Sequence, residues 1–394
     1  MTTAPAHRLL SIDAYRALVM LLMIFVNDTW TLIAIPDWIG HLPAEADGLG
    51  LADVVFPAFL FIVGLSMPFA MQSRLKKGDS RWKIAAHVGM RSLALIVMGF
   101  FHVNFGDYAD TALLPKWIWQ VLVTVGFFLV WLDYPNPKAT AAHVLKTVGC
   151  AALMVLAFVF RREEQPEAWF AMRPQWWGIL GLIGWSYLLV AVAFLLTKGR
   201  AWAQLTVFVG FILFNMGAQS SAFDWLTGVR RHAWIVGDGA LPALTACGVL
   251  ISLLYQRYRS DTGSFLWRAT AAAAVLIAFG LLARQAWNIS KIWATPSFAL
   301  VCAGISTAGF ALMVYTVDAK RWTGWYRFVK PAGTSTLTCY LLPYIHYAVL
   351  GYIGWQLPEA LRTGVIGIAK SIGYALLIIA VTGVLERQRI RLKL

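Results

Sequence analysis

The sequence predicts an all-α fold, a polytopic transmembrane helical bundle of about 12 spans. Hydrophobic residues make up 59% of the 394 residues and charged residues only 13%, and the mean hydropathy is +0.66. A soluble domain carries about 25% charged residues. The apolar residues fall in runs of roughly 18 to 22, the length at which a helix crosses a bilayer. In lipid, a helix satisfies its own backbone polar groups, which favours a helical bundle.

The apolar runs give the order of the expected spans; the fifth, seventh and eighth runs are the weakest, and the count lies between ten and twelve. The first follows a short basic start without a small-x-small cleavage site, so we expect a retained anchor. We expect one domain over 1–394, with a motif-bearing core at 1–135 and the remaining helices at 136–394. The expected spans lie at 14–35, 51–72, 88–105, 114–132, 141–160, 176–196, 201–217, 239–256, 265–283, 296–317, 334–354 and 364–385.

Basic residues alternate between the gaps that separate these runs. The gap after the second run holds Arg74, Lys76, Lys77, Arg81 and Lys83, whereas residues 36–50 contain no Lys or Arg. Cytoplasmic loops are the ones enriched in Lys and Arg, so this alternation predicts that both termini are cytoplasmic. The net charge of +14 is therefore distributed by side of the membrane and not along one patch. That distribution argues against a nucleic-acid partner.

The four cysteines, Cys150, Cys247, Cys302 and Cys339, all lie inside apolar runs. No pair has the spacing of metal ligands, and none lies in a loop that a disulfide would staple. They are interpreted as small core residues, and no metal site is expected.

Polar residues are costly in a membrane and indicate function by default. Asn27 and Asp28 interrupt the outer half of the first span, His41 lies in the following outer loop, and Asp53 opens the second span. Histidine is the natural general base near neutral pH. A carboxylate can fix its tautomer, and an amide donor can polarise a carbonyl oxygen. Alternatively, Asn27 or Asp53 simply bridges two helices.

Two further regions carry polar residues. Asp107 and Asp110 follow the third span and either hold a cationic amine or are solvated loop charges, while Arg91 either meets a phosphate or snorkels to headgroups. His346, in the eleventh run, rivals His41 or bonds across to another helix. The other candidates in these regions are His102, Asn104, Asn288 and Lys291. Position alone thus predicts a polar site near the outer face without naming a reaction.

These residues occur in motifs that resemble the heparan-α-glucosaminide N-acetyltransferase family, in particular its bacterial, NagX-type branch. The resemblance is dense over residues 8–70 and patchy beyond. Here His41 is followed by seven residues up to Gly48 instead of the family's shorter Trp- and Gly-containing link. The matching segments are Arg8-Leu9-Leu10-Ser11-Ile12-Asp13-Ala14-Tyr15-Arg16, Phe25-Val26-Asn27, His41, Ala52-Asp53-Val54-Val55-Phe56-Pro57, Trp119-Gln120 and the Lys-x-Trp-x-x-Pro-Ser pattern from Lys291 to Ser297.

The resemblance implies transfer of acetyl from cytoplasmic acetyl-CoA to the amine of glucosamine or a terminal glucosaminide on the far side of the membrane. The family's essential histidine and partner asparagine map onto His41 and Asn27, with Asp53 as the third catalytic candidate. Candidates for holding acetyl-CoA are Arg16, Arg91, Gln120 and Lys291. Candidates for holding the amino sugar are Asp28, His102, Asp107, Asn288 and His346. The expected location is a bacterial inner membrane.

Two other functions stay open at this stage. Twelve spans with both termini inside are also typical of transporters, so an inner-membrane carrier of glucosamine or N-acetylglucosamine is the first alternative. The second is an O-acyltransferase of a surface glycan, which shares the acyl donor and differs in the acceptor. The sequence does not set the oligomeric state, and a homodimer stays open.

Overall fold

The computed structural model describes residues 10–165, 167–226, 228 and 234–394. Arg8 and Leu9, which begin the first motif, lie outside the described residues. Throughout the described part the chain forms helices and turns, and its only extended pairings are two isolated bridges, Ile33 with Thr363 and Leu132 with Leu392. The predicted all-α class is confirmed. The described residues pack into two compact units, each built from several separate stretches of the chain.

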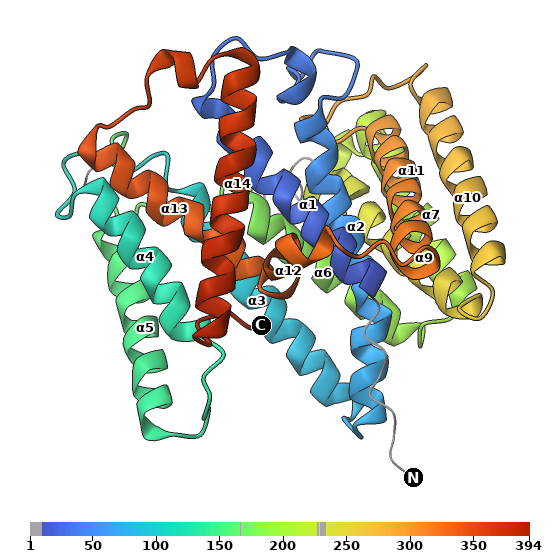
Figure 1. Cartoon of the computed structure of the whole chain (residues 1–394), viewed down its shortest axis with the longest axis horizontal. Coiled ribbons are helices and arrows are strands. Elements are labelled where there is room, and N and C mark those ends of the chain that lie inside the picture. Colours follow the sequence, from blue (N-terminus) through green and yellow to red (C-terminus); the bar gives the residue numbers. More distant parts are fainter. Residues whose placement is uncertain (1–9, 166, 227, 229–233) are drawn as a thin grey trace. The chain divides into compact units, whose positions relative to one another are not determined.

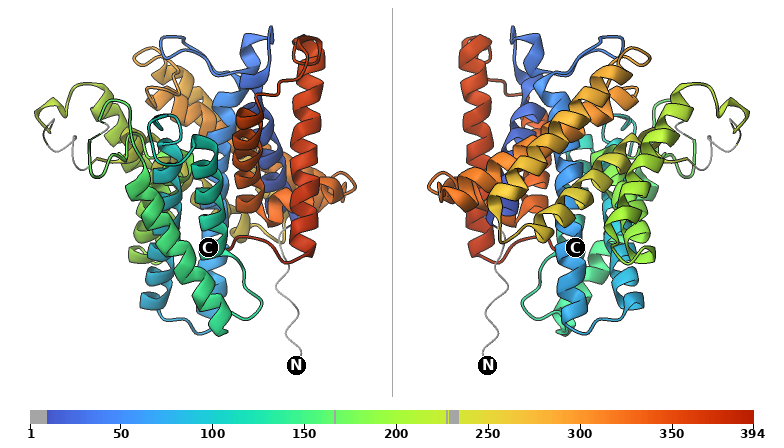
Figure 2. Two further views of the ribbon diagram at one scale, coloured as in Figure 1. Left: turned by 90° about the vertical axis from the view of Figure 1, so that its left-hand side faces the viewer. Right: turned by 90° about the vertical axis from the view of Figure 1, so that its right-hand side faces the viewer.

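The first unit contains residues 10–27, 36–88 and 186–334. Its central helices are α2 (Leu51–Lys76), α9 (Ala240–Arg257) and α11 (Pro296–Met313), which continues as a π-helical turn (Val314–Ala319). Around them lie most of α1 (Leu10–Asp28), α7 (Ala201–Gln219), α10 (Thr262–Ala283) and α12 (Tyr326–Thr334). Figure 2 shows α10 and α11 side by side, and α2 packs closely on α9.

Glycine makes the contact between α2 and α9 possible. A Cβ at Gly64 would lie 1.8 Å from the carbonyl oxygen of Thr245, and a Cβ at Gly248 would lie 2.0 Å from that of Phe61. Small residues let helix backbones approach closely in membranes, where packing replaces the hydrophobic effect as the force between helices. The close packing on α9 fixes α2, and Asp53 lies in the first turn of α2.

The second unit contains residues 28–35, 89–185 and 335–394. It consists of residues 89–103 of α3 (Arg81–Val103), α4 (Lys116–Trp131), α5 (Thr140–Val159), the start of α6 (Gly178–Leu196), α13 (Thr336–Ile353) and α14 (Gly364–Arg387). Figure 1 shows α4 and α5 as a neighbouring pair. The C-terminal tail returns to α4, because Asp133 accepts two hydrogen bonds from Arg391, at 2.8 and 3.0 Å, and one from Lys393 at 3.1 Å.

Within the described residues, ten helices are long and apolar enough to cross a membrane. They correspond to the expected spans except at 114–132 and 334–354. There, α4 has only 16 residues, since Pro115 precedes it and it ends at Trp131, and α13 carries four tyrosines and His346, which reduce its hydropathy. The multi-pass membrane class is confirmed, while the count of twelve and the cytoplasmic placement of the termini stay predictions.

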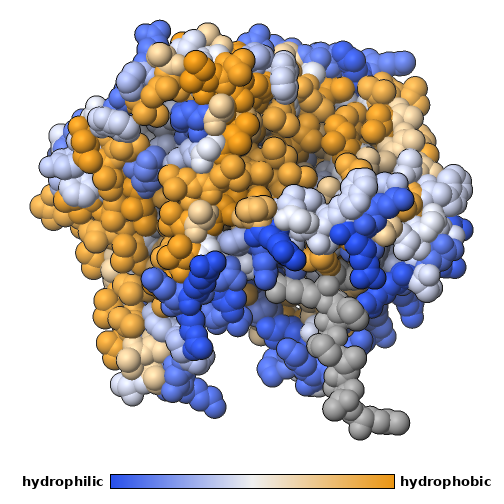
Figure 3. Space-filling view, viewed as in Figure 1, coloured by the Kyte–Doolittle hydropathy of each residue, from blue (hydrophilic) through white to orange (hydrophobic). Residues whose placement is uncertain are grey.

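Burial separates inner helices from outer ones within each unit. In the first unit, 78% of the span window of α11 is buried, against 22% for α10. In the second unit the window of α14 is only 28% buried, and Figure 3 shows apolar residues gathered over α14 and α4. A helix that is apolar yet exposed is stable in lipid and unstable in water. The single-domain assignment with a core at 1–135 stays a prediction, since both units draw on residues from each side of position 135.

Candidate functional site

His41 and Asp53 form a hydrogen-bonded pair in the first unit. His41 follows the short 3₁₀ turn Asp37–Ile39, and Asp53 lies in the first turn of α2. The Nδ1 atom of His41 is 2.7 Å from Oδ1 of Asp53. The histidine side chain is 49% exposed, whereas that of the aspartate is 3% exposed. The pair therefore combines an imidazole open to reactants with a carboxylate closed to water.

The side chain of Asp53 is held in place because its Oδ2 accepts two hydrogen bonds from the backbone of the loop. Its Oδ2 accepts hydrogen bonds from the backbone N–H groups of Leu42, at 3.1 Å, and Gly50, at 3.0 Å. A Cβ at Gly50 would lie 2.0 Å from the carbonyl oxygen of Gly40, so only glycine lets these two parts of the loop meet. A carboxylate on one ring nitrogen places the proton there and leaves the other nitrogen as the acceptor. With its proton on Nδ1, His41 has a free lone pair on Nε2.

Lys291 completes a three-residue cluster. Its Nζ lies 3.0 Å from Nδ1 and 3.3 Å from Nε2 of His41, and 3.8 Å from Oδ1 of Asp53. An atom this close to both ring nitrogens cannot lie in the ring plane without overlapping Cε1, so the amine sits over the face of the imidazole. Consequently it does not compete with Asp53 for the in-plane position at Nδ1. Burial of the ammonium lowers the pKa of Lys291, and the nearby Asp53 charge opposes that shift.

The predicted third partner, Asn27, is the penultimate residue of α1 and is partly buried. In the part of the chain that the structure describes, the side chain of His41 contacts Asp53 and Lys291, and no hydrogen bond joins it to Asn27. The catalytic role of Asn27 stays a prediction.

Asp28, the next residue, belongs to a separate cluster in the second unit. Its carboxylate accepts hydrogen bonds from Tyr347 at 2.6 Å, Lys370 at 2.6 Å and Ser371 at 2.5 Å. His346 lies in the same cluster, with its Nδ1 3.0 Å from the hydroxyl of Tyr374. The structure thus brings together two predicted substrate-binding residues, Asp28 and His346. The carboxylate of Asp28 is already neutralised by an ammonium of the protein itself.

The remaining predicted residues are dispersed. Arg16 donates to Asp13, Ser66 and the carbonyl of Gly333, which ties α1 to its neighbours in the first unit. Arg91 and Gln120 are partly buried on α3 and α4, and Asn288 is exposed. In the second unit, His102 stacks on Tyr344 with ring centroids 4.1 Å apart. Asp107 pairs with Arg162 at 3.0 Å and Gln175 at 2.7 Å, so a residue of the chain already occupies it.

Sequence reasoning missed Lys370, Asp47 and Arg284. Lys370 has a sequence signal, because a lysine within the apolar run 364–385 is an intramembrane ionisable residue. Asp47 and Arg284 have none, since both lie in polar segments where charges are ordinary.

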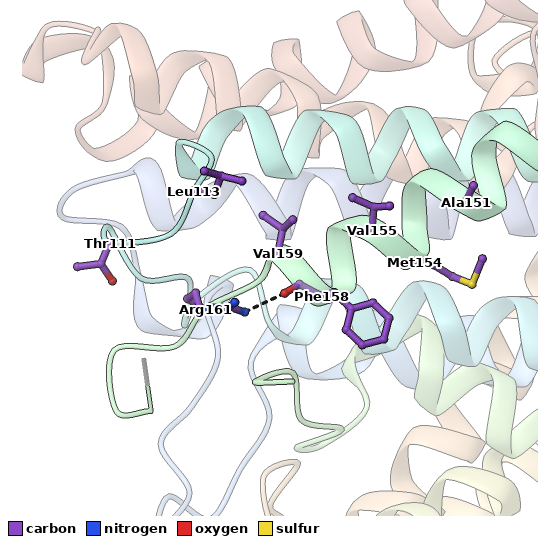
Figure 4. Close-up of a pocket in the computed structure, with 8 residues that line it drawn as sticks. All are labelled: Thr111, Leu113, Ala151, Met154, Val155, Phe158, Val159 and Arg161. Carbon is purple, nitrogen blue, oxygen red and sulfur yellow. Dashed lines mark hydrogen bonds between the residues drawn. The ribbon is translucent and has the colours of Figure 1, made fainter. Parts of the chain in front are cut away.

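A groove of about 510 Å³ lies in the second unit (Figure 4). It is lined by Thr111, Leu113, Arg161 and the exposed apolar side chains of α5. The Arg161 guanidinium is occupied by the carbonyl of Phe158 at 2.8 Å. This groove has the character of a lipid-facing surface, and none of the predicted site residues lines it.

A comparison with known proteins shows that part of the chain is similar to one family. Residues 8–105 match the family model described as heparan-alpha-glucosaminide N-acetyltransferase, catalytic. The human heparan-alpha-glucosaminide N-acetyltransferase is 30% identical over 186 residues, which cover 45% of this chain and 25% of the human protein. The mouse protein of the same name is 37% identical over 103 residues, 25% of this chain and 14% of the mouse protein.

The match thus covers about a quarter or less of either curated relative, and the family model ends at residue 105. It contains His41, Asp53 and Asn27, whereas Lys291 lies beyond the family model. The resemblance predicted from the sequence motifs is confirmed, and residues 8–105 relate this chain to the heparan-alpha-glucosaminide N-acetyltransferase family.

Proposed function

We propose that this membrane protein transfers acetyl from acetyl-CoA, supplied from the cytoplasm, to the amine of glucosamine or a terminal glucosaminide on the periplasmic side of an inner membrane. The observation that carries the proposal is the His41–Asp53 pair, with a buried, fully bonded carboxylate and an open imidazole. The names of the two relatives supply the reaction class. The alternation of loop charges supports the two sides assigned to the donor and the acceptor.

The chemistry needs a base, and Nε2 of His41 is the available one. The neutral amine attacks the thioester carbon, a C–N bond forms, and the C–S bond breaks. His41 takes one proton from the attacking nitrogen and returns it to the departing sulfur, so that CoA leaves as the thiol. Asp53 keeps the proton of the resting imidazole on Nδ1 and stabilises the imidazolium that forms, as the third member of a triad does.

Negative charge develops on the thioester oxygen during attack and requires a donor. Lys291, over the face of the same imidazole, has the reach to supply one, and Asn27 is the donor that the family resemblance implies. We propose Arg16 as a further contact of the CoA moiety and Asn288 as a contact of the sugar, both from the first unit. The roles of Arg91, Gln120, Asp28, His102, Asp107 and His346, which belong to the second unit, stay predictions from the sequence.

A two-step route, in which His41 carries the acetyl group on Nε2 before the amine arrives, uses the same residues. Incubation of the purified protein with radiolabelled acetyl-CoA and no acceptor distinguishes the routes. Label on the peptide that contains His41 supports the acetyl-histidine route, and its absence supports direct transfer.

The main test is acetyl transfer by the purified full chain in nanodiscs, measured by the release of CoA thiol with glucosamine present. His41→Ala is expected to lower kcat at least 100-fold, because general base catalysis contributes about 10²–10⁴. His143→Ala is the matched control, since His143 is an exposed histidine on α5 whose ring contacts the backbone carbonyl of Ala139, four residues before it. Near-normal activity of His41→Ala would contradict the site assignment.

One observation favours the transporter alternative. The ion pair of Asp28 and Lys370 has its ammonium on the apolar helix α14, and ionisable pairs inside the membrane mark transport pathways in many carriers. Transport predicts uptake of labelled glucosamine into proteoliposomes without acetyl-CoA. The acetyltransferase predicts no such uptake, and it predicts a rise in Tm on addition of CoA, because a ligand that binds only the folded state stabilises it.

A further inference from the structure

His41 and Lys291 both lie outside the long helices. His41 is in the loop between α1 and α2, and Lys291 is in the segment between α10 and α11. The two residues are separated by 250 positions in the sequence. Helices hold side chains more precisely than loops do, so the meeting of these two residues needs a device that joins the two loops.

That device is centred on Asp47. Its Oδ1 accepts a hydrogen bond from the backbone N–H of Ile289 at 2.8 Å, and its Oδ2 accepts one from Nε of Arg284 at 2.7 Å. The N–H of Gly48 donates to the carbonyl of Ile289 at 3.0 Å. Asp47 and its neighbour thus bond both the donor and the acceptor of one residue, Ile289.

A second contact continues the connection towards Lys291. The hydroxyl of Ser290 donates to the carbonyl of Ala44 at 2.9 Å, and the N–H of Ser290 donates to Thr295, the cap of α11. Ile289 and Ser290 are only 6% and 3% exposed. Lys291 follows them directly, so its backbone is held against the His41 loop by residues other than itself.

The hydrogen bonds that fix His41 do not hold the two loops together. Asp53 fixes the histidine through Nδ1 and through the N–H groups of Leu42 and Gly50, all within the loop and α2. None of those bonds reaches the 284–295 segment. The position of Lys291 relative to the imidazole therefore depends on the bonds of Asp47, Gly48 and Ser290, of which Asp47 makes two.

We infer that Asp47, together with Arg284, is a positioning residue of the acetyl-transfer site, and that it holds the Lys291 amine over His41. This inference rests on the proposed function for its effect on rate, while the placement of Lys291 can be measured without any activity. Asp47 touches neither the imidazole nor the amine, so it acts only through the loop.

The variants follow from the bonding. Asp47→Asn keeps an oxygen for the N–H of Ile289 and turns an amide donor towards Arg284, and Asp47→Ala removes both bonds. Arg284→Gln removes the partner and leaves Asp47 in place. Asp261→Asn is the matched control, because Asp261 is an aspartate that accepts from Ser264 at the opposite end of α10, whose last residue precedes Arg284.

The first measurement is kcat and KM for acetyl transfer. Displacement of a catalytic group by about 1 Å costs on the order of 100-fold in rate, so Asp47→Ala is expected to lower kcat about 10- to 100-fold, with smaller losses in Asp47→Asn and Arg284→Gln. Asp261→Asn keeps the wild-type kcat. A merely structural role of Asp47 would lower the Tm and the amount of folded protein while leaving kcat per folded molecule unchanged.

The second measurement is the pH dependence of trace labelling of Lys291 by acetic anhydride, followed by mass spectrometry of its peptide. The groups that face Lys291 are His41 from the outer loop, Asp53 from α2 and Cys302 from α11. Burial lowers the pKa of Lys291, so release of the segment in Asp47→Ala moves the labelling midpoint to higher pH.

The two measurements separate the possible failures. A shifted labelling midpoint in a protein that transfers no acetyl supports the loop connection and contradicts the proposed function. Active wild-type protein whose Asp47→Ala and Arg284→Gln variants keep both kcat and the labelling midpoint would overturn the positioning role.

Discussion

Replacing Asp53 with asparagine tests the central pair of the site with almost no change in volume. In the wild-type protein Oδ1 faces Nδ1 of His41, and Oδ2 faces two backbone N–H groups, those of Leu42 and Gly50. An asparagine has one oxygen and one NH₂ group in this position. If its oxygen serves the two N–H groups, its NH₂ faces Nδ1, and the imidazole must move its proton to Nε2.

That tautomer has no lone pair on Nε2 and cannot accept the amine proton. In the other orientation the NH₂ group opposes two buried N–H donors, which costs about 1–3 kcal/mol for each unsatisfied group. The wrong tautomer in a triad lowers kcat about 10⁴-fold. Since each factor of ten corresponds to about 1.4 kcal/mol, a loss of about 10²- to 10⁴-fold raises the barrier by about 3–6 kcal/mol.

The assay is the initial rate of CoA thiol release with glucosamine at saturating acetyl-CoA, together with the Tm of each variant in the same nanodiscs. We expect Asp53→Asn to lower kcat at least 100-fold and to change the Tm by only a few degrees. His143→Ala again serves as the control. A kcat within threefold of wild type would refute the assignment of Asp53 as the residue that sets the tautomer of His41.

Three other changes test the folding of the molecule. Asp28→Asn should lower the free energy of unfolding by about 1–3 kcal/mol, because it leaves the partly buried ammonium of Lys370 without its counter-ion. Lys370→Met in the same chain should recover much of that loss, and equal Tm values for the single and double variants would contradict this. The backbone N–H of Ile289 and the guanidinium of Arg284 hold the pKa of Asp47 below its usual value of 3.8. The contribution of Asp47 to stability is therefore complete above pH 3.8 and is lost as the pH falls below that value. The difference in Tm between wild type and Asp47→Asn should accordingly narrow from pH 7 to pH 3. Burial tends to raise the pKa of Asp133, but the bonds from Arg391 and Lys393 outweigh burial and lower the pKa. Removal of residues 389–394 should therefore lower the Tm at neutral pH. An unchanged Tm would show that the tail does not hold α4.

Much of the fold could be predicted from the sequence because helix formation in a membrane is a local property. A run of apolar residues long enough to cross the bilayer must be helical wherever it lies in the bundle. The exceptions have local reasons as well, since Pro115 delays the start of α4 and the tyrosines of α13 reduce its hydropathy.

The candidate site was predictable only in part. His41 and Asp53 are 12 positions apart, one in the loop before α2 and the other in the first turn of α2, so their pairing follows from a short connection. Lys291 could be singled out as part of a motif, but its position over the imidazole could not. The motif says which residues belong together, and it contains no information on the backbone bonds of Asp47 and Ser290 that bring the loops together.

The sequence by itself determined that this is a helical membrane protein, where most of its long apolar helices lie, and that a histidine and a carboxylate lie close together in the sequence around the start of the second of them. Only the tertiary structure decided which distant side chains neutralise the charges in the chain. Lys370 pairs with Asp28 across 342 positions, and Arg284 pairs with Asp47 across 237. The reason is physical: hydrophobic length acts on each helix separately, whereas a buried charge is tolerated only beside its partner, and that partner is chosen by how the helices pack.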